Sequence, residues 1–83
     1  MLHAGGEVHL TQLEYRLLAV LIREQGRVVT HRQLMQEVWG PGHAERTHYL
    51  RIYMKQLREK LEDNPAQPAH LLTETGVGYR LQA

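Results

Sequence analysis

The segment HYLRIYMKQLREKL, residues 48–61, carries side chains that could recognise a polar partner from one face of a helix. Its apolar residues recur at spacings of four, three and four, as expected for a buried helical stripe: Leu50, Met54, Leu57 and Leu61. At about 100° per residue, the opposite side carries His48, Tyr49, Ile52, Lys55, Gln56 and Glu59. A solvated face would consist mostly of Glu, Lys and Gln. The aliphatic and aromatic residues among these polar groups therefore indicate a recognition surface.

The charge distribution adds to this indication. The formal net charge is only +1, which argues against a generally basic protein that binds nucleic acid without specificity. Between Arg46 and Lys60, however, there are five cationic side chains and a single acid, Glu59. This local excess favours an anionic partner, although an ordinary solvated basic helix face explains it as well.

Length and composition fit one small domain over residues 1–83. Hydrophobic residues make up 42% and charged residues 23% of the chain, an ordinary globular composition. The absence of cysteine excludes disulfides, thiolate chemistry and Cys-ligated metal sites, and it is compatible with a cytoplasmic protein. The longest apolar run, LLAVLI, has six residues, whereas a membrane span needs about 20, so we expect no membrane segment. The start, MLHAGGEVHL, lacks the pattern of a secretory signal.

Enzymatic and metal-binding motifs are missing from the sequence. There is no G-x-S-x-G, no Walker sequence and no H-E-x-x-H, and GVG is too short to be a phosphate-binding loop. His43 and His48 are five positions apart, and His3 and His9 lie near the start, so no pair has the helical spacing of a zinc motif. We expect no enzyme activity, no metal and no cofactor.

Local signals predict the order of the elements. Thr11 and Glu14 form a T-x-x-E capping box, and Thr30 is a second helix cap. The expected elements are a strand at 7–10, a helix at 13–25 ended by Gly26, a strand at 27–30, a helix at 31–39, a loop at 41–47, a helix at 48–61 and a hairpin at 70–83. Three helices followed by a C-terminal β-hairpin predict an α+β fold of the winged helix-turn-helix type.

Four segments carry a resemblance to a known family: VHLTQLEYRLLAVL at 8–21, GRVVTHRQLMQEVWG at 26–40, HYLRIYMKQLREKLEDNP at 48–65 and LTETGVGYR at 72–80. In this order they resemble the DNA-binding effector domain of OmpR/PhoB-class bacterial two-component response regulators. The details are most similar to the potassium-transport regulators of that class. The family's N-terminal receiver domain and most of its first sheet have no counterpart, so we expect a fragment with a largely truncated N-terminal sheet.

The resemblance implies that residues 48–61 form a recognition helix in the major groove, which is about 12 Å wide. Gln56 could pair with adenine, Lys55 could meet guanine or a phosphate, and Ile52 could touch a thymine methyl group. The family's contact positions fall on His48, Tyr49, Ile52, Tyr53 and Gln56, and Arg58 matches a phosphate contact. Alternatives stay open: Tyr53 could be packing, Ile52 an isolated exposed apolar residue, and Arg58 a member of a weak ion pair.

Two further groups complete the expected contacts. Thr30, His31 and Arg32 begin a helix whose free N–H groups and positive dipole end would suit a phosphate, and Trp39 could be core or donate to a phosphate. The hairpin at 73–80 is expected to be the wing, with its contacts drawn from Thr73, Thr75, Gly78, Tyr79 and Arg80. Many family members carry a basic residue at the position of Thr75, so a less basic wing contact is predicted.

Partners follow from the resemblance alone. The family's loop corresponding to 41–47 faces RNA polymerase, and full-length relatives bind promoter DNA as homodimers after a sensor histidine kinase acts on the receiver domain. Regulation of potassium-uptake genes is the most specific expectation. The competing hypothesis is a winged-helix module that binds protein and not DNA.

Overall fold

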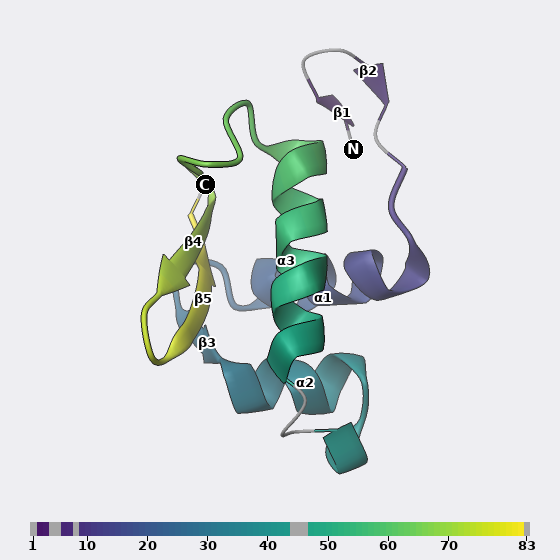
Figure 1. Ribbon diagram of the computed structural model, residues 1–83, viewed down its shortest axis with the longest axis vertical. Coiled ribbons are helices and arrows are strands. Elements are labelled where there is room, and N and C mark those ends of the chain that lie inside the picture. Colours follow the sequence, from purple (N-terminus) through teal and green to yellow (C-terminus); the bar gives the residue numbers. More distant parts are fainter. Residues whose placement is uncertain (1, 4–5, 8, 44–46, 83) are drawn as a thin grey trace.

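The computed structural model describes residues 2–3, 6–7, 9–43 and 47–82 (Figure 1). Its helices are α1 (Gln12–Arg23), α2 (His31–Val38), the short 3₁₀ helix η1 (Pro41–His43) and α3 (Thr47–Leu61). Its strands are β1 (Leu2–His3), β2 (Gly6–Glu7), β3 (Val28–Thr30), β4 (Leu71–Glu74) and β5 (Gly78–Leu81). The predicted order of three helices followed by a hairpin is confirmed, and with it the α+β winged helix-turn-helix fold.

The predicted capping box begins α1. The Glu14 N–H donates to Thr11 Oγ1 at 3.3 Å, and the Thr11 N–H donates back to Glu14 Oε1 at 2.8 Å. The helix covers Gln12–Arg23 and so ends before the predicted stop at Gly26. Gly26, at φ +84°, instead shapes the following turn, where its N–H donates to Leu81 O at 2.9 Å.

One hydrophobic core joins the three helices to the sheet. It comprises Leu17, Leu18, Val20, Leu21, Val29, Leu34, Met35, Val38, Leu50, Met54, Leu57, Leu71 and Tyr79. The predicted stripe of α3 is confirmed, since Leu50, Met54 and Leu57 are buried and Leu61 packs against the core. Because this stripe faces inward, the opposite side of α3 is left at the surface (Figure 1).

The wing is part of a three-stranded antiparallel sheet in the order β3-β5-β4. Tyr79 of the central strand β5 pairs with Val29 of β3 on one side and with Thr73 of β4 on the other. The strand expected at 27–30 is present as β3, but its pairing with the hairpin had no local signal. It ties the wing to the start of α2, where the His31 N–H donates to Val77 O at 3.1 Å.

The strand expected at 7–10 is wrong as stated. Glu7 closes the short strand β2, which pairs with β1, while His9 and Leu10 are not in a strand and Val8 lies outside the described residues. The alternation in EVHL is misleading because Leu10 packs against the core immediately before the α1 cap.

Two buried carboxylates hold the C-terminal half of α3. Glu62, only 4% exposed, accepts N–H donors from Ala69, His70 and Leu71 at 3.2, 2.9 and 2.7 Å. Burial alone would raise the pKa of Glu62, but these three donors hold it below its ordinary value. Glu14 in α1 accepts from Lys60 Nζ at 2.6 Å, which fixes the far end of α3 to the first helix.

No helix in the described part of the chain is long and apolar enough to cross a membrane.

Candidate nucleic-acid interface

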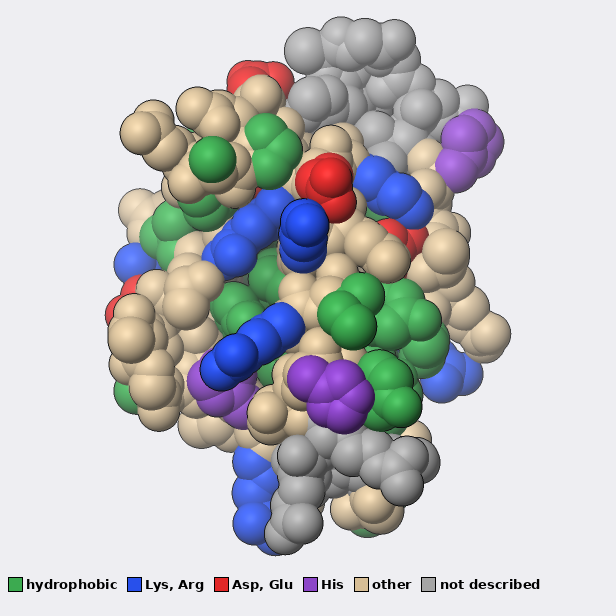
Figure 2. Space-filling view, in the orientation of Figure 1, with side chains coloured by type: hydrophobic (Ala, Val, Ile, Leu, Met, Phe, Trp, Pro, Cys, Tyr) green, Lys and Arg blue, Asp and Glu red, His purple; other side chains and the backbone are tan. Residues whose placement is uncertain are grey.

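The outer face of α3 presents the side chains that the sequence singled out. Ile52 is 49% exposed and Tyr49 38%, and His48, Lys55 and Glu59 are also exposed, while Gln56 is half-buried. The rings of His48 and Tyr49 lie 4.2 Å apart. Figure 2 shows cationic side chains and histidine gathered over α3, beside an apolar patch. The structure therefore brings polar, cationic and apolar groups together on one exposed helix face.

Tyr53 and Trp39 pack on each other at one edge of this face. Their ring centroids are 5.4 Å apart, and both side chains are half-buried against the core. Packing is therefore part of the role of Tyr53, as one of the two alternatives predicted. Each ring keeps some exposed surface, so contact with a partner stays a prediction.

The start of α2 is less open than the sequence suggested. The Gln33 N–H donates to Thr30 Oγ1 at 3.1 Å, and the His31 N–H is used by Val77 O. The His31 ring meets Tyr79 edge-on, with centroids 5.4 Å apart. Arg32 is exposed. Because two N–H groups of this first turn already have acceptors, an anion here would depend more on Arg32 and the helix dipole.

The expected wing residues separate into an exposed tip and a buried base. Thr75 is exposed, whereas Tyr79 is 5% exposed and Gly78 is buried. A Cβ at Gly78 would lie 1.9 Å from Val29 O, so this glycine permits close approach of β3 and not of a partner. The exposed tip also includes Val77, at 51%, which the sequence reasoning missed although it stands between two glycines.

Arg80 braces the hairpin. Its Nε donates to Glu74 Oε2 at 3.0 Å, and its Nη1 donates to Gln82 Oε1. Two of its guanidinium nitrogens are therefore used within the hairpin and its C-terminal end. The wing is left with little positive charge at its tip, in line with the less basic wing that Thr75 predicted.

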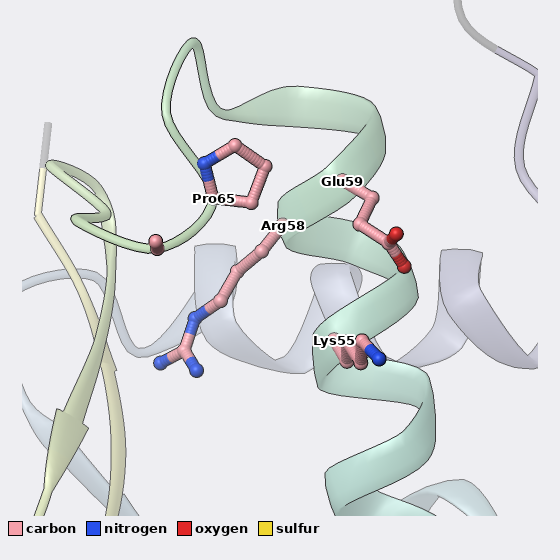
Figure 3. A pocket seen from close by; sticks show the side chains of 5 residues that line it. Lys55, Arg58, Glu59 and Pro65 are labelled. Atoms are coloured by element: carbon pink, nitrogen blue, oxygen red, sulfur yellow. The ribbon is translucent and has the colours of Figure 1, made fainter.

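Arg58 points from α3 to the hairpin (Figure 3). Its Nε donates to Leu71 O at 3.0 Å and its Nη2 to Thr73 Oγ1 at 2.6 Å. The ion-pair alternative does not describe these contacts, because both acceptors are neutral, and the phosphate contact stays a prediction. A hollow of about 330 Å³ lies beside it, lined by Lys55, Arg58, Glu59, Pro65 and Ala66 (Figure 3).

Unpaired cations remain on the exposed surface. Among the residues that the structure covers, the exposed cations without an ion pair are Arg16, Arg27, Arg32, Arg51 and Lys55. Arg32 starts α2, and Arg51 and Lys55 lie on α3. Such charges are free to meet an anionic partner, since no internal acid competes for them. Within residues 9–42 and 47–82, no group of three metal-binding side chains comes together.

The loop expected to face a partner protein is placed only in part. Residues 41–43 form η1, whereas residues 44–46 lie outside the described residues. The predicted polymerase surface at 41–47 stays a prediction.

Comparisons with known proteins agree with this geometry. The family model of the transcriptional regulatory protein C-terminal domain matches residues 5–81. The KDP operon transcriptional regulatory protein KdpE of Escherichia coli is 59% identical over 81 residues, which cover 96% of this chain and 36% of that protein. The chain thus spans about a third of the length of this relative.

Two solved structures extend the likeness to the fold. The Thermotoga maritima response regulator DrrB, an OmpR/PhoB homologue, has a TM-score of 0.82 and 29% identity over 95% of this chain and 36% of its own. The Klebsiella pneumoniae RstA DNA-binding domain, solved in complex with the RstA box, has a TM-score of 0.79 and 25% identity over 94% of this chain and 77% of its own.

Proposed function

The chain belongs to the family of transcriptional regulatory protein C-terminal domains, whose members are transcription regulators and not enzymes, and on that basis we propose that it binds double-stranded promoter DNA in a sequence-specific way. The observation that carries the proposal is the outer face of α3. It offers a hydrogen-bonding amide, a free cation and an exposed aliphatic side chain on one helix of a size that the major groove admits. The RstA domain, solved with its DNA, supports the same use of this fold.

Each side chain on this face has a role that its chemistry supports. Gln56 reads adenine through paired hydrogen bonds, and Ile52 packs on a thymine methyl group. Lys55 meets guanine or a phosphate, since no internal acid among the described residues holds it. His48 and Tyr49, whose rings lie close together at the start of α3, contact sugar or phosphate at the edge of the groove.

The flanking elements position the helix on the backbone. Arg32 and the N-terminal end of α2 approach a phosphate of the DNA. Trp39 and Tyr53 lie beside the adjoining part of the DNA backbone. The wing lies along the neighbouring minor groove through Thr73, Thr75 and its tip. Gly78, Tyr79 and Arg80 serve this contact from within the sheet, where they set the shape of the hairpin.

We infer the wider biology from the resemblance to response regulators. As part of a response regulator in the cytoplasm, the domain would act with a receiver domain that a sensor histidine kinase phosphorylates, and pairs of such proteins would bind tandem sites. The loop at 41–47 would face RNA polymerase. The identity to KdpE of the KDP operon supports potassium-uptake genes as the regulated targets.

The test is fluorescence anisotropy of the domain on a randomised duplex pool, titrated across salt, with the bound DNA sequenced. We expect a short enriched motif, and an affinity that falls with salt because several phosphate contacts release counterions. With a net charge of +1, binding by one domain should be weak. Binding that ignores sequence, or no binding at about 50 mM salt, would favour the protein-interaction module.

A further inference from the structure

Arg58 is the side chain that joins the recognition helix to the wing. It begins on α3, and its guanidinium group reaches both strands of the hairpin. It donates to Leu71 O and Thr73 Oγ1 on β4, and its Cζ lies 5.7 Å from the ring centroid of Tyr79 on β5. The two hydrogen bonds span a backbone oxygen and a side-chain oxygen two residues apart, a geometry that suits the planar fork of arginine.

The neighbouring cation behaves differently. Lys55 lies one turn before Arg58 on α3 and lines the same hollow, but it is exposed and points away from the hairpin (Figure 3). Arg58 is half-buried, and two of its donor nitrogens are already used within the protein. A phosphate contact through Arg58 would compete with these bonds, whereas a phosphate contact through Lys55 would compete with nothing in the described structure.

The ring of Tyr79 extends this connection to the third DNA-facing element. Arg58 lies over Tyr79, and His31 at the start of α2 meets the same ring edge-on. The recognition helix, the wing and the start of α2 therefore converge on one buried ring. A side chain that holds α3 to this ring and to β4 fixes the wing relative to the helix that reads DNA.

We propose that Arg58 is a positioning residue that holds the wing against α3, so that the major-groove and minor-groove contacts form together. The effect on DNA binding rests on the proposed function. The contacts of Arg58 with Leu71, Thr73 and Tyr79, here called the brace, are already present in the free protein. In this proposal Lys55 contacts a phosphate, whereas Arg58 fixes the position of the wing. A phosphate contact needs only a positive charge, so it would survive a change from arginine to lysine, whereas the two-pronged contact of Arg58 would not.

The first experiment compares Arg58→Lys, Arg58→Ala and Lys55→Ala on the enriched duplex, with Arg16→Lys on the exposed side of α1 as a matched control. Lysine keeps the charge but cannot form the two-pronged contact, so we expect both Arg58 variants to lose roughly tenfold in affinity, about the effect of one charge-assisted hydrogen bond. Hydroxyl-radical protection of the flanking minor groove should fade in both, while protection by α3 persists. Lys55→Ala should instead lower the salt slope by about 1, and Arg16→Lys should change nothing.

The proposal would be overturned if Arg58→Lys bound and protected DNA like the wild type while Arg58→Ala alone lowered the salt slope. Arg58 would then be a phosphate contact. A wild type that binds no duplex would refute the proposed function. The brace is then decided in the free protein by a double-mutant cycle of Arg58→Lys and Thr73→Val, measured by urea unfolding. Non-additive losses support the brace, and strictly additive losses overturn it.

Discussion

Replacing Gly78 with alanine should damage the sheet that carries the wing. A Cβ at this position would lie 1.9 Å from Val29 O, 2.7 Å from Val29 C and 2.8 Å from Thr30 Cα, all of them backbone atoms of β3. Carbon–oxygen contacts between strands are about 3.3–3.6 Å, so β3 and β5 would have to separate by more than about 1 Å. No rotamer change relieves this clash, because both partners are backbone.

The expected cost follows from what the separation breaks. Val28, Val29 and Thr30 pair with Arg80, Tyr79 and Gly78. Losing two or three of the ladder hydrogen bonds, at about 1 kcal/mol net each, together with about 1–3 kcal/mol of overpacking, gives about 3–6 kcal/mol. A domain of this size has a total stability of about 4–12 kcal/mol, so the loss is a large share of it.

Urea unfolding followed by circular dichroism measures the effect, with two glycine controls. Gly42→Ala should be nearly neutral, since nothing lies within 4 Å of its Cβ. Gly76→Ala, in open space but at φ +76°, should cost about 1–2 kcal/mol of backbone strain. A Gly78→Ala variant within about 1 kcal/mol of Gly42→Ala would refute the close-approach reasoning.

Three further changes test other parts of the molecule. Gln56→Ala should relax base preference at one position by roughly 1–3 kcal/mol in binding selections, and equal losses on enriched and scrambled duplexes would contradict base reading. Because hydrogen bonds hold the pKa of Glu62 below the ordinary value of a glutamate, the stability it contributes is fully present above that ordinary pKa and is lost as the pH falls through the lowered pKa. Acid unfolding of Glu62→Gln should therefore show a smaller loss on acidification, and a curve parallel to the wild type would argue against this role. Thr30→Ala should lower the unfolding free energy by about 1 kcal/mol in urea, with Thr30→Ser close to wild type, because Thr30 Oγ1 caps α2; equal effects of the two changes would count against the cap.

The helices could be predicted from the sequence because their signals are local. The stripe of α3 and the caps at Thr11 and Thr30 depend on residues within one or two turns of each other. The strand predicted at residues 7–10 from the same kind of local pattern, an alternation over four residues, was wrong. Strands of two residues, such as β1 and β2, are too short for that pattern to detect.

The strand pairing and the hydrogen bonds between segments far apart in the sequence could not be predicted. The pairing of Val28 with Arg80 and the bonds from Arg58 to the hairpin connect residues far apart in sequence, and no spacing rule encodes them. The types of residue in the site were predictable, since Ile52, Lys55 and Gln56 are exposed or half-exposed on one face. Which cations are free was not, because Arg58 and Arg80 have their partners only in the folded sheet.

The outer face of α3 is the surface that we propose meets DNA. The most direct measurement is a titration of the isotopically labelled domain with the enriched duplex, followed by amide chemical shifts in NMR spectra. We expect the shifts to concentrate in α3, the start of α2 and the wing at 73–77, and the exposed side of α1 around Tyr15 and Ile22 to stay unchanged. Shifts that concentrate on α1 and spare α3 would show that α3 is not the DNA-binding face.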